Sequence, residues 1–115
     1  MDNIKYIVKK IKKFRDERDW MQFHDPKNMS ISIILEAAEL LEHFQWKSTE
    51  EAVRHAREHK EEIADEIADI AMYLFELADS LQIDLLDAME KKLAKNEQKY
   101  PVEKSHGVAT KYTKL

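Results

Sequence analysis

The sequence predicts an all-α protein, and three observations carry that prediction. The 115 residues contain one glycine, two prolines and no cysteine. Tight two-residue hairpins favour Gly or Asn-Gly at their centre, and Gly107 lies in the C-terminal tail, so a meander of strands is not expected. Apolar residues instead recur three and four positions apart, which is the period of an amphipathic helix. The predicted fold is therefore a bundle of four to five helices with short connections.

The first two helices are predicted from an apolar stripe and a capping signal. The N-terminal helix carries one apolar stripe, formed by Ile4, Ile7, Ile11 and Phe14. Either Asn28 or Ser30 offers a side-chain oxygen suited to an N-cap, and the apolar run behind it extends to about His43. A second helix that ends near His43 is therefore expected.

The second half of the chain predicts three further helices. Ser48-Thr49-Glu50-Glu51 matches a capping box that opens a short helix ending near His59. The next helix, from Glu61 to Ser80, has one apolar face, formed by Ile63, Ile67, Ile70, Leu74 and Leu77. Asp84 is the expected cap of the last helix, which stops at Tyr100 because Pro101 cannot continue it. Residues 102–115 have no strong period and are expected to form a less regular tail of a single domain, 1–115.

Composition excludes several classes of function. Without glycine loops the chain cannot form a P-loop or a dinucleotide fingerprint, and without cysteine it has no disulfide scaffold or thiolate zinc site. Residues 34–90 carry 16 acidic and four basic side chains, a balance that repels nucleic acid and favours cations. No apolar run approaches the roughly 20 residues of a membrane span. We therefore expect a cytoplasmic protein with no nucleic-acid and no membrane partner.

Several carboxylates stand inside otherwise apolar helices. Glu36 and Glu39 are three positions apart and share a helix face. The fourth helix carries a stripe with steps of four, three and four: Glu62, Glu66, Asp69 and Tyr73. Burying unpaired carboxylates costs on the order of several kcal/mol, and few basic residues lie nearby. The all-oxygen donor set favours Mg²⁺ or Mn²⁺, whereas a solvated acidic face is the alternative interpretation.

Two other metal patterns are weaker. His55-Ala56-Arg57-Glu58-His59 spells an inverted zincin motif, but the segment has almost no apolar face and is expected to be solvated. Glu39 and His43 are four apart, whereas di-iron bundles need Glu-x-x-His on each of two helices.

Aromatic residues stand next to polar ones in three places. The run Trp20-Met21-Gln22-Phe23-His24 follows the first helix, and Trp46 and Tyr73 would lie on the metal-facing side if their helices were regular. Such groups can stack on and read a nucleobase, although core packing at helix ends is the alternative. Asn96 and Lys99 on the last helix could contact phosphates or a sugar.

These segments together resemble the MazG-like nucleotide pyrophosphohydrolases, in their dCTP pyrophosphatase-like branch. The resemblance covers nearly the whole chain. It is carried by Arg18–His24, Pro26–Asn28, Glu36–Leu40, Phe44–Lys47, Glu66–Asp69 with Tyr73-Leu74, Ile83–Leu85, Asn96 with Lys99–Pro101, and Lys111–Thr113.

The resemblance implies a fold, an activity and a set of site residues. The fold is an all-α MazG-like bundle that assembles into a homodimer or homotetramer. The activity is Mg²⁺-dependent (or Mn²⁺-dependent) hydrolysis of a nucleoside triphosphate, dCTP or a related or modified dNTP, to the monophosphate and pyrophosphate. The metal ligands are Glu36, Glu39, Glu66 and Asp69. The substrate-binding residues are Trp20, Met21, Gln22, Phe23, His24, Trp46, Tyr73, Asn96 and Lys99.

The sequence leaves four points open. Glu62 and Asp65 offer a second register for the metal pair, and Glu66 and Asp69 are preferred because the family places its tyrosine just after the aspartate. Glu39 is the expected general base, and Glu36 is the second expected catalytic residue. Ile11 stands where vertebrate dCTP pyrophosphatases carry a histidine, which puts strict dCTP preference in doubt. The alternative function is a non-catalytic helical module that forms oligomers.

Overall fold

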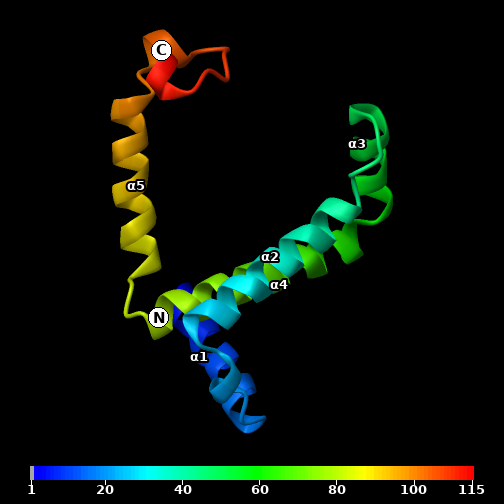
Figure 1. Ribbon diagram of the computed structural model, residues 1–115, viewed down its shortest axis with the longest axis vertical. Helices are drawn as coiled ribbons and strands as arrows, with labels where there is room; N and C mark the ends of the chain where they lie inside the picture. The colour runs from blue at the N-terminus through cyan, green and yellow to red at the C-terminus, as the bar shows by residue number, and fades with distance from the viewer. Residues whose placement is uncertain (1) are drawn as a thin grey trace. The chain divides into compact units, whose positions relative to one another are not determined.

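The computed structural model describes residues 2–115, which form helices and no strands (Figure 1). The all-α prediction is therefore confirmed. The chain divides into two compact units, Met1–Leu81 and Gln82–Leu115.

The first unit begins with α1 (Asn3–Glu17) and a single 3₁₀ turn, η1 (Met21–Phe23). Asp2 caps α1, because its side chain accepts a hydrogen bond from the Ile4 amide at 2.9 Å. Between α1 and η1 the chain reverses through Asp19, whose φ of 53° is left-handed. Gln22 supports this turn by donating to the Asp19 carbonyl and carboxylate. The turn leads from α1 directly into the aromatic run, residues 20–24.

Helix α2 (Pro26–Glu42) begins earlier than the sequence predicts. Asp25 is its N-cap, since its carboxylate accepts from the Asn28 amide at 2.9 Å and from the Asn28 side chain at 2.8 Å. The prediction of a cap at Asn28 or Ser30 was wrong. Pro26 occupies the first helical position, where its fixed φ and missing N–H are well tolerated.

Helices α3 (Thr49–Glu58) and α4 (Lys60–Ser80) follow the predicted bounds closely. The capping box at the start of α3 is confirmed, with Ser48 and Glu51 bonding each other's backbone amides. His59 separates the two helices with a non-helical backbone. Helices α2 and α4 run side by side in opposite directions, with α3 in the connection between them (Figure 1).

Very few side chains of the described residues are fully buried. The apolar ones are Met29 in α2, which is 1% exposed, and Ile63 and Ala78 in α4. The apolar face predicted for α4 is only partly covered, because Ile67 and Leu74 are exposed. The remaining two buried residues are charged: Arg15 in α1 and Glu76 in α4.

The second unit consists of α5 (Leu85–Lys99), α6 (Val102–Ser105) and a 3₁₀ turn, η2 (Tyr112–Lys114). Asp84 caps α5 as predicted, accepting from the Asp87 amide at 3.1 Å. Tyr100 ends α5 and packs edge-on against Tyr112, with ring centroids 5.8 Å apart. Among the helices described, none has the length and apolar character needed to cross a bilayer.

Candidate metal centre

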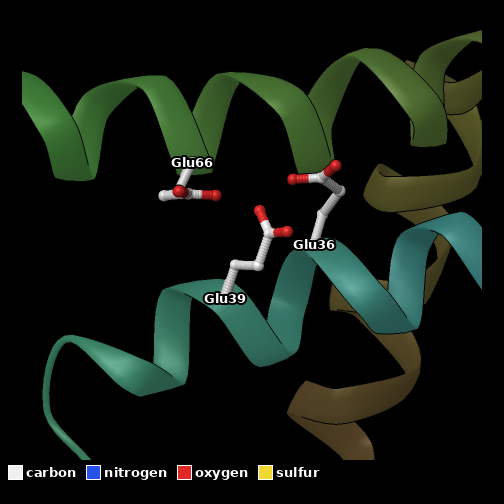
Figure 2. A group of neighbouring side chains, drawn as sticks. All are labelled: Glu36, Glu39 and Glu66. Carbon is white, nitrogen blue, oxygen red and sulfur yellow. The ribbon is translucent and has the colours of Figure 1, made fainter.

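Three carboxylates from α2 and α4 converge in the first unit. Glu36 and Glu39 point from α2 toward α4, and Glu66 points back from α4 (Figure 2). One oxygen from each of the three lies within 4.8 Å of the others. The spacing of three residues on α2 places both of its glutamates on the face that packs against α4. Two acids of α2 and one acid of α4, which is distant in sequence, thus share one small volume.

The surroundings of this cluster disfavour negative charge. Glu36 and Glu66 are half-buried, and the Oε2 atom of each is enclosed without a hydrogen-bond partner. Withdrawal from water raises the pKa of Glu36 to about 7, and the neighbouring Glu39 carboxyl contributes to the same effect. The pKa of Glu66 is raised for the same two reasons. The cluster therefore needs either protons or a cation.

A divalent cation with a preference for oxygen fits this donor set. All three groups are carboxylates, and buried oxygens that lack hydrogen-bond partners are available as ligands. Mg²⁺ binds through one or two carboxylates together with substrate phosphates and water. The structure offers no nitrogen or sulfur donor within the cluster of Glu36, Glu39 and Glu66, and so the arrangement fits Mg²⁺ or Mn²⁺ better than Zn²⁺.

Asp69 lies beside the cluster without joining it. Its charge acts on Glu36 and Glu66, where it contributes to their raised pKa values. Its oxygens are outside the group of three that lies within 4.8 Å. Glu66, and not Glu62, meets the α2 glutamates. This placement agrees with the preferred register of the α4 pair.

A pocket of about 360 Å³ adjoins the carboxylates. Its lining is Glu39, Glu42, His43, Lys47, His55 and Glu66. His43 Nδ1 lies 2.9 Å from His55 Nε2, and the His55 ring stacks on His59 at 4.0 Å. The expectation of a solvated segment was wrong for His55 and His59, which are half-buried because their rings pack together. Burial lowers the pKa of His55.

The aromatic run that follows α1 in the sequence is exposed except at its last residue. Trp20, Met21, Gln22 and Phe23 are exposed, whereas His24 is half-buried. The His24 ring packs edge-on against Tyr73, with centroids 6.5 Å apart. Burial raises the pKa of Tyr73, and the charges of Glu36 and Asp69 add to this. His24 and Tyr73 thus connect the run to the carboxylate cluster.

The remaining predicted residues lie in different surroundings. Trp46 is 87% exposed and follows α2 in a turn, so the premise that a regular helix turns it toward the metal was wrong. In the second unit, Asn96 and Lys99 are half-buried. The Lys99 ammonium lies over the Tyr112 ring, 4.7 Å from its centroid.

The structure also reveals two residues that the sequence interpretation missed. Glu76 in α4 accepts from Arg15 at 3.1 Å and lies 2.7 Å from His24 Nδ1. A signal for Glu76 exists in the sequence. It is three residues beyond Tyr73, and so it continues the acidic stripe of α4 by one more step. Arg15 has no such signal, because it is one of six basic residues among residues 1–15.

Comparisons with known proteins agree on one family. The model of the MazG-like family matches residues 31–115. The chain is 44% identical over 104 residues to dCTP pyrophosphatase 1 of Rattus norvegicus, and 36% identical over 104 residues to that of Homo sapiens. Each match covers 89% of this chain and 61% of the relative. The chain therefore spans about three fifths of these relatives' length.

A solved structure matches over most of both chains. The crystal structure of a pyrophosphatase from Archaeoglobus fulgidus superimposes with a TM-score of 0.84 at 40% identity, over 88% of this chain and 94% of that one. The fold, the family model and the identity to these relatives lead to the same result. The chain belongs to the MazG-like family.

Proposed function

We propose that this protein hydrolyses a (deoxy)nucleoside triphosphate, dCTP or a related or modified dNTP, to the monophosphate and pyrophosphate. The observation that carries the proposal is the cluster of Glu36, Glu39 and Glu66, in which one enclosed oxygen of Glu36 and one of Glu66 lack hydrogen-bond partners. Family membership and relatives named dCTP pyrophosphatase and pyrophosphatase support the same activity.

Glu36, Glu39, Glu66 and Asp69 would hold the metal. When bound there, Mg²⁺ offsets phosphate charge and polarises the phosphoryl oxygens. This need for a cation explains why a triphosphate can approach a segment whose acids outnumber its bases by 12. Asp69, which lies just outside the group of three, would complete the oxygen donors on the α4 side.

Glu39 is the proposed general base, and Glu36 supports it. Glu39 is exposed, whereas Glu36 and Glu66 are half-buried, so it has the freest access to water. It would take a proton from the water that attacks the α-phosphorus in line. The bond from the α-phosphorus to the bridging oxygen breaks, and pyrophosphate leaves.

The nucleobase is assigned to the aromatic run and Tyr73. Trp20, Met21, Gln22 and Phe23 present exposed apolar and polar groups, as a base-stacking surface requires. His24 is half-buried and packs against Tyr73. Trp46 belongs to the same proposed set. Asn96 and Lys99 in the second unit are proposed to contact the phosphates.

We also infer that the working form is a homodimer or homotetramer. Helix α2 exposes Ile31, Ile34, Leu35 and Leu41. Helix α4 exposes Ile67, Met72 and Leu74. Large apolar patches of this kind mark interaction surfaces, and a second copy of the chain offers the complementary apolar surface.

The test of activity is incubation with each dNTP in turn, with Mg²⁺ and with excess EDTA. Chromatography of the products should show the monophosphate and pyrophosphate with Mg²⁺ and no product with EDTA. Full hydrolysis in EDTA would contradict the metal assignment. No product from any dNTP would favour the alternative, a non-catalytic module that forms oligomers.

A substitution at the cluster sharpens this test. Glu36→Gln keeps the size of the side chain but removes its charge, and should lower kcat by orders of magnitude while circular dichroism stays unchanged. Glu62→Gln is the matched control, because Glu62 is an exposed acid on α4 outside the cluster. Equal losses in both variants would sink the assignment of the site.

A further inference from the structure

Two side chains, Arg15 of α1 and His24 after η1, meet at the buried carboxylate of Glu76 in α4. Its Oε1 atom accepts a hydrogen bond from Arg15 Nη1 at 3.1 Å and lies 2.7 Å from His24 Nδ1. Glu76 is 4% exposed and Arg15 is 7% exposed. Buried charges are costly unless they are paired. An arrangement that keeps two such charges and a histidine therefore calls for a role.

The contacts determine which nitrogen of His24 carries hydrogen. Glu76 is paired with the permanently charged Arg15 guanidinium, and an ionised carboxylate can only accept hydrogen bonds. His24 Nδ1, at 2.7 Å from this carboxylate, must therefore be the protonated nitrogen. Because Arg15 already supplies the counter-charge, the imidazole need not be cationic. In the neutral ring, Nε2 then carries a lone pair and acts as an acceptor.

The other nitrogen of His24 is free to meet a ligand. Nε2 has no hydrogen-bond partner among residues 2–115, and it is not among the enclosed atoms that lack one. It therefore reaches solvent. The ring packs against Tyr73, whose hydroxyl is influenced by the charges of Glu36 and Asp69. Tyr73, the neighbour of this ring, lies one helical turn beyond Asp69 on α4, so the ring packs close to a proposed metal ligand.

We propose that Glu76, held by Arg15, is a positioning residue that fixes His24 with Nδ1 protonated, so that Nε2 accepts a hydrogen bond from an exocyclic amine of the bound nucleobase. The ligand chemistry is that of an amino-substituted base, such as the 4-amino group of cytosine. This inference rests on the proposed function for the ligand, but the state of His24 itself can be measured without a substrate.

The tautomer of His24 is read directly by long-range ¹⁵N–¹³C correlation spectra of the histidine rings at a pH where imidazole is neutral. In the wild-type chain, Nδ1 should be protonated and Nε2 should not. In the double variant Arg15→Met, Glu76→Met the ring should lose this fixed state, because both the acceptor and its counter-charge are gone. Replacing the two charges together avoids leaving one of them buried without a partner.

The chain offers a matched control for this double variant. Lys12 and Asp79 also join α1 to α4, at 3.2 Å, but they are half-exposed and neither contacts His24. The double variant Lys12→Met, Asp79→Met removes an ion pair between the same two helices. It should leave the His24 spectrum and the kinetics unchanged.

Steady-state kinetics test the ligand. Loss of one hydrogen bond should raise KM for dCTP about tenfold in Arg15→Met, Glu76→Met, with kcat unchanged. KM for dUTP, which has a carbonyl in place of the amine, should change little.

A wild-type His24 protonated at Nε2, or a tautomer unaffected by the double variant, would overturn the positioning role. Equal changes in KM for dCTP and dUTP would contradict the proposal that His24 recognises the exocyclic amine. If no dNTP is hydrolysed, the proposed function fails, and the spectra alone decide the role of Glu76.

Discussion

Glu36 is the residue whose ionisation differs most clearly from that of a free side chain. Its pKa in the folded protein is about 7, against an ordinary value of 4.5, because its carboxyl is withdrawn from water beside other acids. The folded chain therefore holds this proton more tightly than the unfolded chain does. A proton held in this way links folding to pH and to metal binding.

This linkage predicts how stability depends on pH without metal. The contribution of Glu36 to folding is fully present below pH 4.5 and is lost as the pH rises through about 7. We expect the free energy of unfolding of the wild-type chain in EDTA to fall across this window relative to that of Glu36→Gln. Urea denaturation at a series of pH values measures the difference. Parallel profiles for the two chains would contradict the prediction.

Magnesium should reverse this trend in the wild-type chain. Because metal ligands must be deprotonated, the metal competes with the proton at the cluster. The rise in Tm caused by added Mg²⁺ should therefore grow as the pH increases from 4.5 to about 7. The rise should be much smaller in Glu36→Gln, which lacks one ligand. A metal effect that is independent of pH would argue against binding at these carboxylates.

At the scale of the element, α3 depends on its capping box. The Ser48 hydroxyl accepts a hydrogen bond from the Glu51 amide at 3.2 Å, and the Glu51 carboxylate accepts one from the Ser48 amide. Ser48→Ala should cost about 1 kcal/mol of stability, as N-cap losses do. Denaturant unfolding measures this cost. Ser80→Ala is the control, because its hydroxyl bonds a carbonyl at the end of α4 and caps nothing; an equal loss there would refute the assignment.

Helices were predictable from sequence where local signals were unique. The capping box at Ser48 and the stop at Pro101 each have one interpretation, and both agree with the structure. The start of α2 had several, because Asp25, Asn28 and Ser30 are all suitable caps. The choice of Asp25 follows from Pro26, which is favourable at the first helical position and unfavourable further inside.

The site was predictable only as far as helical periodicity extends. Helical periodicity places Glu36 and Glu39 on one face of α2 and Glu66 on the acidic stripe of α4. The structure brings these three residues together. Trp46 was misplaced because α2 ends at Glu42, before that residue is reached. The pairing of Arg15 with Glu76 spans 61 positions, and a contact between distant segments leaves no periodic signal in one sequence.

At the scale of the whole molecule, the fold buries only a small part of its apolar side chains. Only three apolar residues are buried among residues 2–115. If a second copy covers the apolar side chains of α2 and α4, folding and association are coupled. Tm should then rise with chain concentration, and light scattering should give twice or four times the mass of 13.7 kDa. A monomer with a constant Tm would contradict the inferred oligomer.

The carboxylates stand on the two helices that pack side by side, and none of them is on a loop. Amide groups in the best-packed elements exchange with solvent hydrogen only through the largest openings of a protein. The backbone around Glu36, Glu39 and Glu66 should therefore exchange as slowly as any part of the chain. The ligands then keep their spacing between turnovers, and a cation would enter a preformed set of oxygens without first ordering a flexible segment.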